Sequence, residues 1–149
     1  MNSEKLSYPK QACACAVSLD LLGDKWSLLI IRDLFRGKST YSEFLKKSDE
    51  GIATNILVDR LKKLVAMGII DFIRNPRDKK IKKYFLTDRG IDLYPVIYEL
   101  QFWTLKHVDF DHTDNTKNWN DLIKNTSPDE VINQFQNGYR ALRQSEFGF

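Results

Sequence analysis

A change of residue periodicity at residue 69 constrains the fold of this chain more than any other feature. Before it, apolar residues recur at helical spacing, as at Leu57, Leu61 and Leu64 in "TNILVDRLKKLVAMG". After it, "IIDFIR" and "IKKYFL" are rich in β-branched and aromatic residues, and the "NPRD" between them is typical of a turn. The sequence therefore predicts a helical region followed by a β-hairpin over residues 69–86.

Capping signals predict three helices before the hairpin. The first helix begins after Asp24 and ends near Gly37, because acidic residues cap helix starts and glycine favours helix ends. The second begins at Thr40, with Glu43 at the spacing of a capping box. The third carries the apolar stripe described above and ends at Gly68.

More helices are predicted after the hairpin. Thr87 can cap a long, mostly apolar segment, in which Pro95 indicates a kink or a break between two helices. The polar stretch "DHTDNTKNWNDLIKN" is expected to include a loop anchored by Trp119 and Leu122. A final helix begins after Ser127 with a capping box and a proline at its first position.

The order of elements predicts a mainly α fold with a small β-hairpin (α+β), a winged helix-turn-helix with additional N- and C-terminal dimerisation helices. The 149 residues are enough for one domain with a hydrophobic core and few for two independent ones. We therefore expect residues 1–149 to form a single domain. Residues 13–87 would form the helix-turn-helix and wing, and residues 88–149 the dimerisation helices and a C-terminal extension.

Charge is distributed unevenly along the chain. The net charge of +3 divides into +6 over residues 1–107 and −3 over residues 108–149. The hairpin segment, residues 69–86, holds six cations against two acidic residues. A charged turn is often only solvated, but a basic hairpin directly after a helix-turn-helix favours contact with DNA phosphates, while the third helix enters the major groove.

Double-stranded DNA is therefore the expected partner. Residues of the third helix would contact bases or backbone, with a structural role as the alternative for Arg60. The start of the second helix would offer backbone N–H groups to a phosphate, and plain helix capping is the alternative there. The predicted DNA-binding residues are Ser39, Thr40, Tyr41, Thr54, Asn55, Arg60, Arg74, Arg77, Lys79, Lys80 and Lys82.

Other functional classes lack a positive signal in the sequence. No Walker A, G-x-G-x-x-G, H-E-x-x-H or nucleophile-elbow motif occurs, so neither an enzyme nor a cofactor is expected. The segment "HVDFDHTD" lacks the glycine and glutamate of a calcium loop, which favours a solvated helix end over a metal site. The aliphatic run Leu28–Ile31 is too short to cross a bilayer, and the polar N-terminus has no signal-peptide core, so a cytoplasmic location is expected.

A set of residues and motifs falls in a characteristic order over roughly residues 13–107: Cys13, Leu19, Asp20, Leu22, "GDKW", Leu28, Leu29, Ile30, Arg32, Leu34, Phe44, Gly51, Ile52, Leu57, Arg60, Leu61, Leu64, Gly68, "YFLTDRG", Pro95 and Trp103. With this set the chain resembles the HxlR-type transcriptional regulators. The resemblance implies a homodimeric winged-helix repressor or activator, related in shape to MarR-type proteins, that binds a pseudo-palindromic operator. Ala53 departs from the pattern, because the family commonly caps the third helix with Ser or Thr at this position.

The resemblance also implies tuning by electrophiles or oxidants through an N-terminal cysteine, which makes Cys13 the redox-sensor candidate. The alternative for Cys13 is a small buried apolar residue, and Cys15 has no counterpart in the family pattern. A further alternative is a winged helix that binds a protein partner or a small-molecule effector without redox sensing.

Dimerisation is expected because two recognition helices must be held about one DNA turn apart, roughly 34–36 Å. The long apolar helix and the last helix would supply the contacts, and a small-molecule pocket between them is left open. The predicted interface residues are Leu93, Ile97, Leu100, Trp103, Phe135 and Tyr139.

Overall fold

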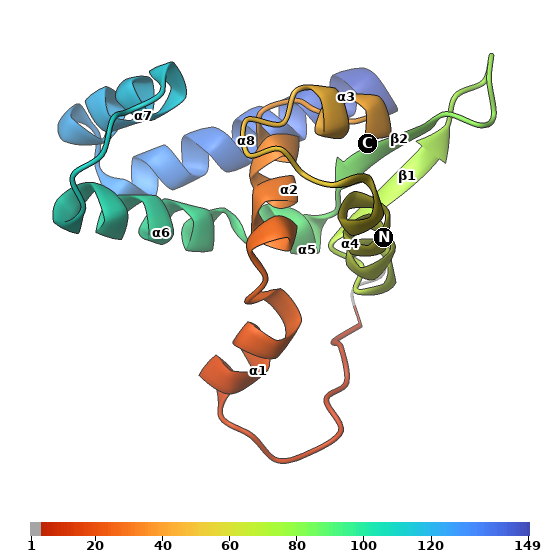
Figure 1. Cartoon of the computed structure of the whole chain (residues 1–149), viewed down its shortest axis with the longest axis horizontal. Helices are drawn as coiled ribbons and strands as arrows, with labels where there is room; N and C mark the ends of the chain where they lie inside the picture. Colours follow the sequence, from red (N-terminus) through yellow and green to blue (C-terminus); the bar gives the residue numbers. More distant parts are fainter. Residues whose placement is uncertain (1–3) are drawn as a thin grey trace. The chain divides into compact units, whose positions relative to one another are not determined.

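The computed structural model describes residues 4–149 and confirms a mainly helical fold with one two-stranded hairpin (Figure 1). The chain divides into two compact units, Met1–Ile91 and Asp92–Phe149. No helix among the described residues is both long and apolar enough to cross a membrane. The elements are α1 (Ala14–Leu22), α2 (Lys25–Phe35), α3 (Tyr41–Lys46), α4 (Thr54–Ala66), β1 (Ile70–Arg74), β2 (Lys82–Leu86), α5 (Asp88–Ile91), α6 (Tyr94–His107), α7 (Asp114–Asn125) and α8 (Pro128–Phe147).

Helices α2, α3 and α4 begin where the sequence predicts. Asp24 accepts a hydrogen bond from the Ser27 backbone N–H at 2.8 Å, and Thr40 and Glu43 complete the capping box of α3. The cap position of α4 is Ala53, which has no side-chain hydrogen bond to offer. The start of α4 is therefore held by its packing rather than by a cap.

The core of the first unit is made of apolar side chains from the three helices and the hairpin. Each helix buries one stripe, as its periodicity predicts, and the inner residues of the strands cover these stripes. The side chains less than 2% exposed in this core include Ile31, Leu34, Phe44, Leu57, Leu64, Ile70 and Leu86.

The strands of the hairpin are antiparallel, with Phe72 paired to Tyr84. The segment before α3 adds a third, strand-like contact, because Thr40 bridges Lys83 and the Tyr84 N–H donates to the Ser39 carbonyl at 2.7 Å. This contact fixes the start of α3 against β2. The loop between the strands projects beyond the helices of its unit (Figure 1).

Helix α1 differs from the other helices of the first unit because it buries none of its residues. Its sequence is largely apolar, and Leu19 is 64% exposed. Periodicity alone does not give the bounds of this helix, since it has no stripe that packs within the unit.

The second unit contains α6, α7 and α8, and α8 packs against both of the others. The break at Pro95 is confirmed, because α5 ends at Ile91 and proline occupies the first turn of α6. The polar stretch includes a loop at residues 111–113, as expected, and the rest of it forms α7. Thr113 caps α7 there, and Trp119 is buried with its ring N–H donating to the Tyr94 hydroxyl at 3.0 Å.

Candidate nucleic-acid interface

The start of α4 presents polar side chains to solvent. Thr54 and Asn55 lie in its first turn and are exposed. Leu57, Leu61 and Leu64 form a stripe of the helix that is buried in the core. Burial of that stripe fixes the rotation of α4, so Asn55 faces outward, and Thr54 is exposed at the first position of the helix.

The hydroxyls before α3 are already engaged in capping. Ser39 is 8% exposed, and both Ser39 and Thr40 direct their hydroxyl and backbone N–H groups to the Glu43 carboxylate. Burial alone would raise the pKa of Glu43, but these hydrogen bonds outweigh burial and hold the pKa below its ordinary value. Among the three residues predicted here, Tyr41 has the side chain that is least committed to capping.

The hairpin tip is shaped by its own hydrogen bonds. Asn75 and Asp78 accept from backbone N–H groups two residues ahead, which is the arrangement of Asx turns. The Arg74 guanidinium folds back onto the Lys79 carbonyl at 2.9 Å. Arg77, Lys79 and Lys80 are exposed on this ordered tip. Their charges are therefore displayed on a defined loop.

Arg60 lies on α4 but is held by carboxylates. Its guanidinium donates to Asp24 at 2.7 and 3.1 Å and to Asp59 at 2.6 Å. The hydrogen bond from Arg60 is the main reason that the pKa of Asp24 lies well below its ordinary value. The same carboxylate caps α2, so this arrangement supports the structural role for Arg60, as a tie between α2 and α4.

A second ion-pair group holds the turn between α3 and α4. Arg32 on α2 makes a bidentate contact with Glu50 at 2.7 and 2.9 Å and also contacts Asp33 at 2.8 Å. Lys38 joins Asp33 at 3.1 Å and donates to the Lys47 carbonyl at 2.7 Å. The hydrogen bonds from Arg32 hold the pKa of Glu50 below its ordinary value. These contacts set the position of α4 relative to α3.

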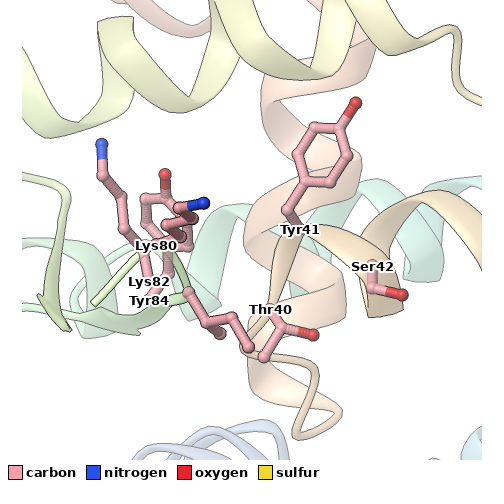
Figure 2. A pocket seen from close by; sticks show the side chains of 7 residues that line it. Thr40, Tyr41, Ser42, Lys80, Lys82 and Tyr84 are labelled. Carbon is pink, nitrogen blue, oxygen red and sulfur yellow. The ribbon is translucent and has the colours of Figure 1, made fainter. Parts of the chain in front are cut away.

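A cleft of about 460 Å³ lies between the start of α3 and the outer half of the hairpin. In Figure 2 Lys80, Lys82 and Tyr84 stand together, and Tyr41 stands apart from them on the start of α3. Ser42, Ile81 and Tyr84 are not among the residues predicted for a site, although the alternation of Lys82 and Tyr84 along a strand indicates a shared face. We call this feature the wing cleft; its lining residues are Thr40, Tyr41, Ser42, Lys80, Ile81, Lys82 and Tyr84.

Comparison with known protein families places the chain. Residues 21–112, more than half of the chain, match the family described as HxlR-like helix-turn-helix. The chain belongs to the HxlR-like helix-turn-helix family. The family description is one of a helix-turn-helix and names no enzymatic activity.

Relatives and solved structures agree with this placement. Rv3095 of Mycobacterium tuberculosis, an uncharacterized HTH-type transcriptional regulator, is 34% identical over 98 residues. The match covers 66% of this chain and 61% of that relative. The transcription-factor candidate PA1607 superimposes with a TM-score of 0.61 and 35% identity, over 68% of this chain and 72% of its own. The redox regulator HypR in its oxidized form superimposes with a TM-score of 0.58 and 26% sequence identity. That match covers 66% of this chain and 100% of the HypR chain.

The HxlR-like match ends before α7, so α7 and α8 lie outside it. The predicted interface residues fall in α6, in α8 and just before α6. Leu100 and Trp103 are exposed, whereas Ile97 and Tyr139 are buried within their own unit. Leu93 and Phe135 are half-buried.

Both cysteines of this HxlR-like chain are exposed free thiols. Cys13 is the cap of α1, where its sulfur accepts from the Ala16 N–H at 3.4 Å. Burial as a small apolar residue, the alternative role for Cys13, is therefore wrong in this chain.

Proposed function

We propose that this chain is a transcriptional regulator that binds a specific double-stranded DNA operator as a homodimer. The observation that carries the proposal is the joint display of the exposed start of α4 and the ordered basic hairpin in one compact unit. A helix in the major groove reads base edges, and the hairpin lysines neutralise phosphates. Its family and the relatives described as HTH-type transcriptional regulators support the proposal.

The test is a fluorescence-anisotropy titration of the reduced protein. One duplex carries DNA from upstream of its own gene, and a second carries the same bases shuffled. We expect the upstream duplex to bind about 1,000-fold more tightly at moderate salt, the lower end of the range for specific binding. Equal binding to both duplexes at every salt concentration would contradict sequence-specific recognition.

The contribution of the hairpin can be measured from the salt dependence. Replacing Lys79 and Lys80 by Ala should weaken binding to all duplexes and lower the slope of log affinity against log salt by up to about two units. The control replaces the exposed lysines Lys117 and Lys124 of α7, which the proposal does not use. An unchanged slope in the hairpin variant would remove the hairpin from the interface.

We also propose that oxidation of Cys13 alters operator binding. Support comes from its exposure, its place at the start of α1 and the similarity to HypR, which is described as a redox regulator. Mild oxidation should change DNA affinity about tenfold in the wild type and in a Cys15→Ser variant, but not in Cys13→Ser. A Cys13→Ser variant that still responds to oxidant would assign the response elsewhere.

A further inference from the structure

The wing cleft combines features that DNA binding alone does not require. A DNA phosphate needs cations, but the cleft also has an aromatic and aliphatic lining from Tyr41, Ile81 and Tyr84. Its volume of about 460 Å³ lies within the range of small-molecule sites. The chemistry of the walls therefore indicates what ligand would fit.

The cations of the cleft are available to an anion. Within residues 4–149, neither Lys80 nor Lys82 forms an ion pair with a carboxylate. Lys82 places its ammonium 4.4 Å from the centre of the Phe72 ring, which holds this side chain over the hairpin. A carboxylate between the two lysines would gain charge-assisted hydrogen bonds without displacing an acidic side chain.

Tyr84 supplies a fixed polar group at the same place. The residue is 8% exposed, and its ring packs against Phe72 with the centroids 5.6 Å apart and against Phe44 with the centroids 6.3 Å apart. Burial raises the pKa of the Tyr84 hydroxyl, so this group stays protonated and can donate a hydrogen bond. A rigid donor beside two lysines favours an anion of defined shape over a diffuse polyanion.

We propose that the wing cleft binds a small aromatic carboxylate, whose ring packs between Tyr41 and Ile81 and whose carboxylate meets Lys80, Lys82 and Tyr84. The proposed function uses the same lysines to contact DNA phosphates, so the bound acid displaces DNA. This competition rests on the proposed function, whereas binding of the acid does not. The cleft thus makes the hairpin a site of effector control.

Calorimetric titration of the full-length reduced protein with naphthoate tests the site directly. Naphthamide is the matched neutral probe, and decahydronaphthoate is the acid with the same carbon skeleton and no aromatic ring. We expect naphthoate to bind with a dissociation constant of about 1 mM or below, and each control probe to bind about tenfold more weakly. Naphthoate binding no tighter than naphthamide would overturn the proposal.

Variants locate the site and separate it from DNA binding. Tyr84→Phe and Ile81→Ala should each weaken naphthoate about fivefold to tenfold, because one removes the donor and the other a wall. Lys80→Ala and Lys79→Ala form a matched pair of exposed neighbours, of which only Lys80 lines the cleft. Both should weaken DNA binding, but only Lys80→Ala should weaken naphthoate. Equal naphthoate affinity in the two variants would overturn the assignment.

Adding naphthoate to the anisotropy assay tests the competition. DNA affinity should fall in the wild type in proportion to cleft occupancy, and in Tyr84→Phe the same fall should need about fivefold to tenfold more naphthoate. If the protein binds naphthoate through Lys80 and Tyr84 but binds no DNA, the proposed function fails and the ligand site stands. If DNA binds and naphthoate does not, the ligand site fails and the proposed function stands.

Discussion

At the scale of single residues, Asp24 links helices α2 and α4, and no pattern in the sequence predicts this link. Its carboxylate caps α2 and also receives the Arg60 guanidinium from α4. The sequence identifies the cap because capping is local. The sequence does not decide whether Arg60 contacts DNA or has a structural role. Its contact with Asp24 joins residues 36 positions apart and depends on how α2 packs against α4.

Replacing Asp24 by Ala should lower the free energy of unfolding by about 2 kcal/mol, about half from the lost cap and half from the ion pair. The ion-pair share is small because 34% of the Asp24 side chain and 23% of the Arg60 side chain remain exposed and water screens their charges. Urea unfolding at neutral pH measures the loss. A double-mutant cycle with Arg60→Ala isolates the pair, and a cycle energy of zero would contradict the tie between the helices.

The same residue gives a pH dependence with a defined sign. The pKa of Asp24 is lower in the folded chain than its ordinary value of 3.8, so the folded state binds fewer protons near that pH. Its stabilisation is present above pH 3.8 and is lost as pH falls through the folded pKa. The difference in unfolding free energy between wild type and Asp24→Asn should therefore shrink as pH falls below about 4. A difference that stays constant down to pH 2 would exclude this linkage.

At the scale of elements, α4 begins without the side-chain cap that α2 and α3 have. Ala53 has the extended backbone of a cap residue, with φ −74° and ψ 147°, and its side chain is exposed. Ala53→Ser should raise the free energy of unfolding by about 1 kcal/mol, because the hydroxyl can accept a free N–H of the first turn. Thermal and urea unfolding measure the gain. Ala53→Val is the control that adds bulk without an acceptor, and an equal gain in both variants would argue against capping.

The elements also show what the sequence can and cannot predict. The starts of α2, α3 and α8 and the hairpin follow from caps and periodicity, which act over a few residues. Helix α7 escaped prediction because its polar, Asn-rich sequence favours turns, while its helix is anchored by Trp119 packing edge-on to Tyr98 at 5.2 Å. The wing cleft could not be predicted from the sequence, because it depends on the contact between Thr40 and Lys83 of β2, which lie far apart in the chain.

At the scale of the whole molecule, the exposed apolar surface of α6 is the feature that a single copy of the chain leaves unexplained. The residues Val96, Leu100, Trp103 and His107 recur at helical spacing. Trp103 is 61% exposed, and its ring lies tilted against the His107 ring with the centroids 5.2 Å apart. The opposite side of the helix holds Tyr98, which is 2% exposed. Large exposed apolar stripes favour association, which supports the proposed homodimer.

A charge placed on this stripe should therefore separate the proposed dimer. We expect Trp103→Glu to shift the protein to a monomer at micromolar concentration, measured by sedimentation equilibrium, because an ionised carboxylate would have to be buried at the interface. Asn118→Glu is the control, since it adds the same charge at an exposed position of α7. The monomer should bind an operator of two half-sites at least about 100-fold more weakly, because the second half-site no longer gains from the first. A Trp103→Glu protein that keeps the mass and operator affinity of the wild type would place the interface on another surface, and α1, which buries none of its residues, would be the next to test.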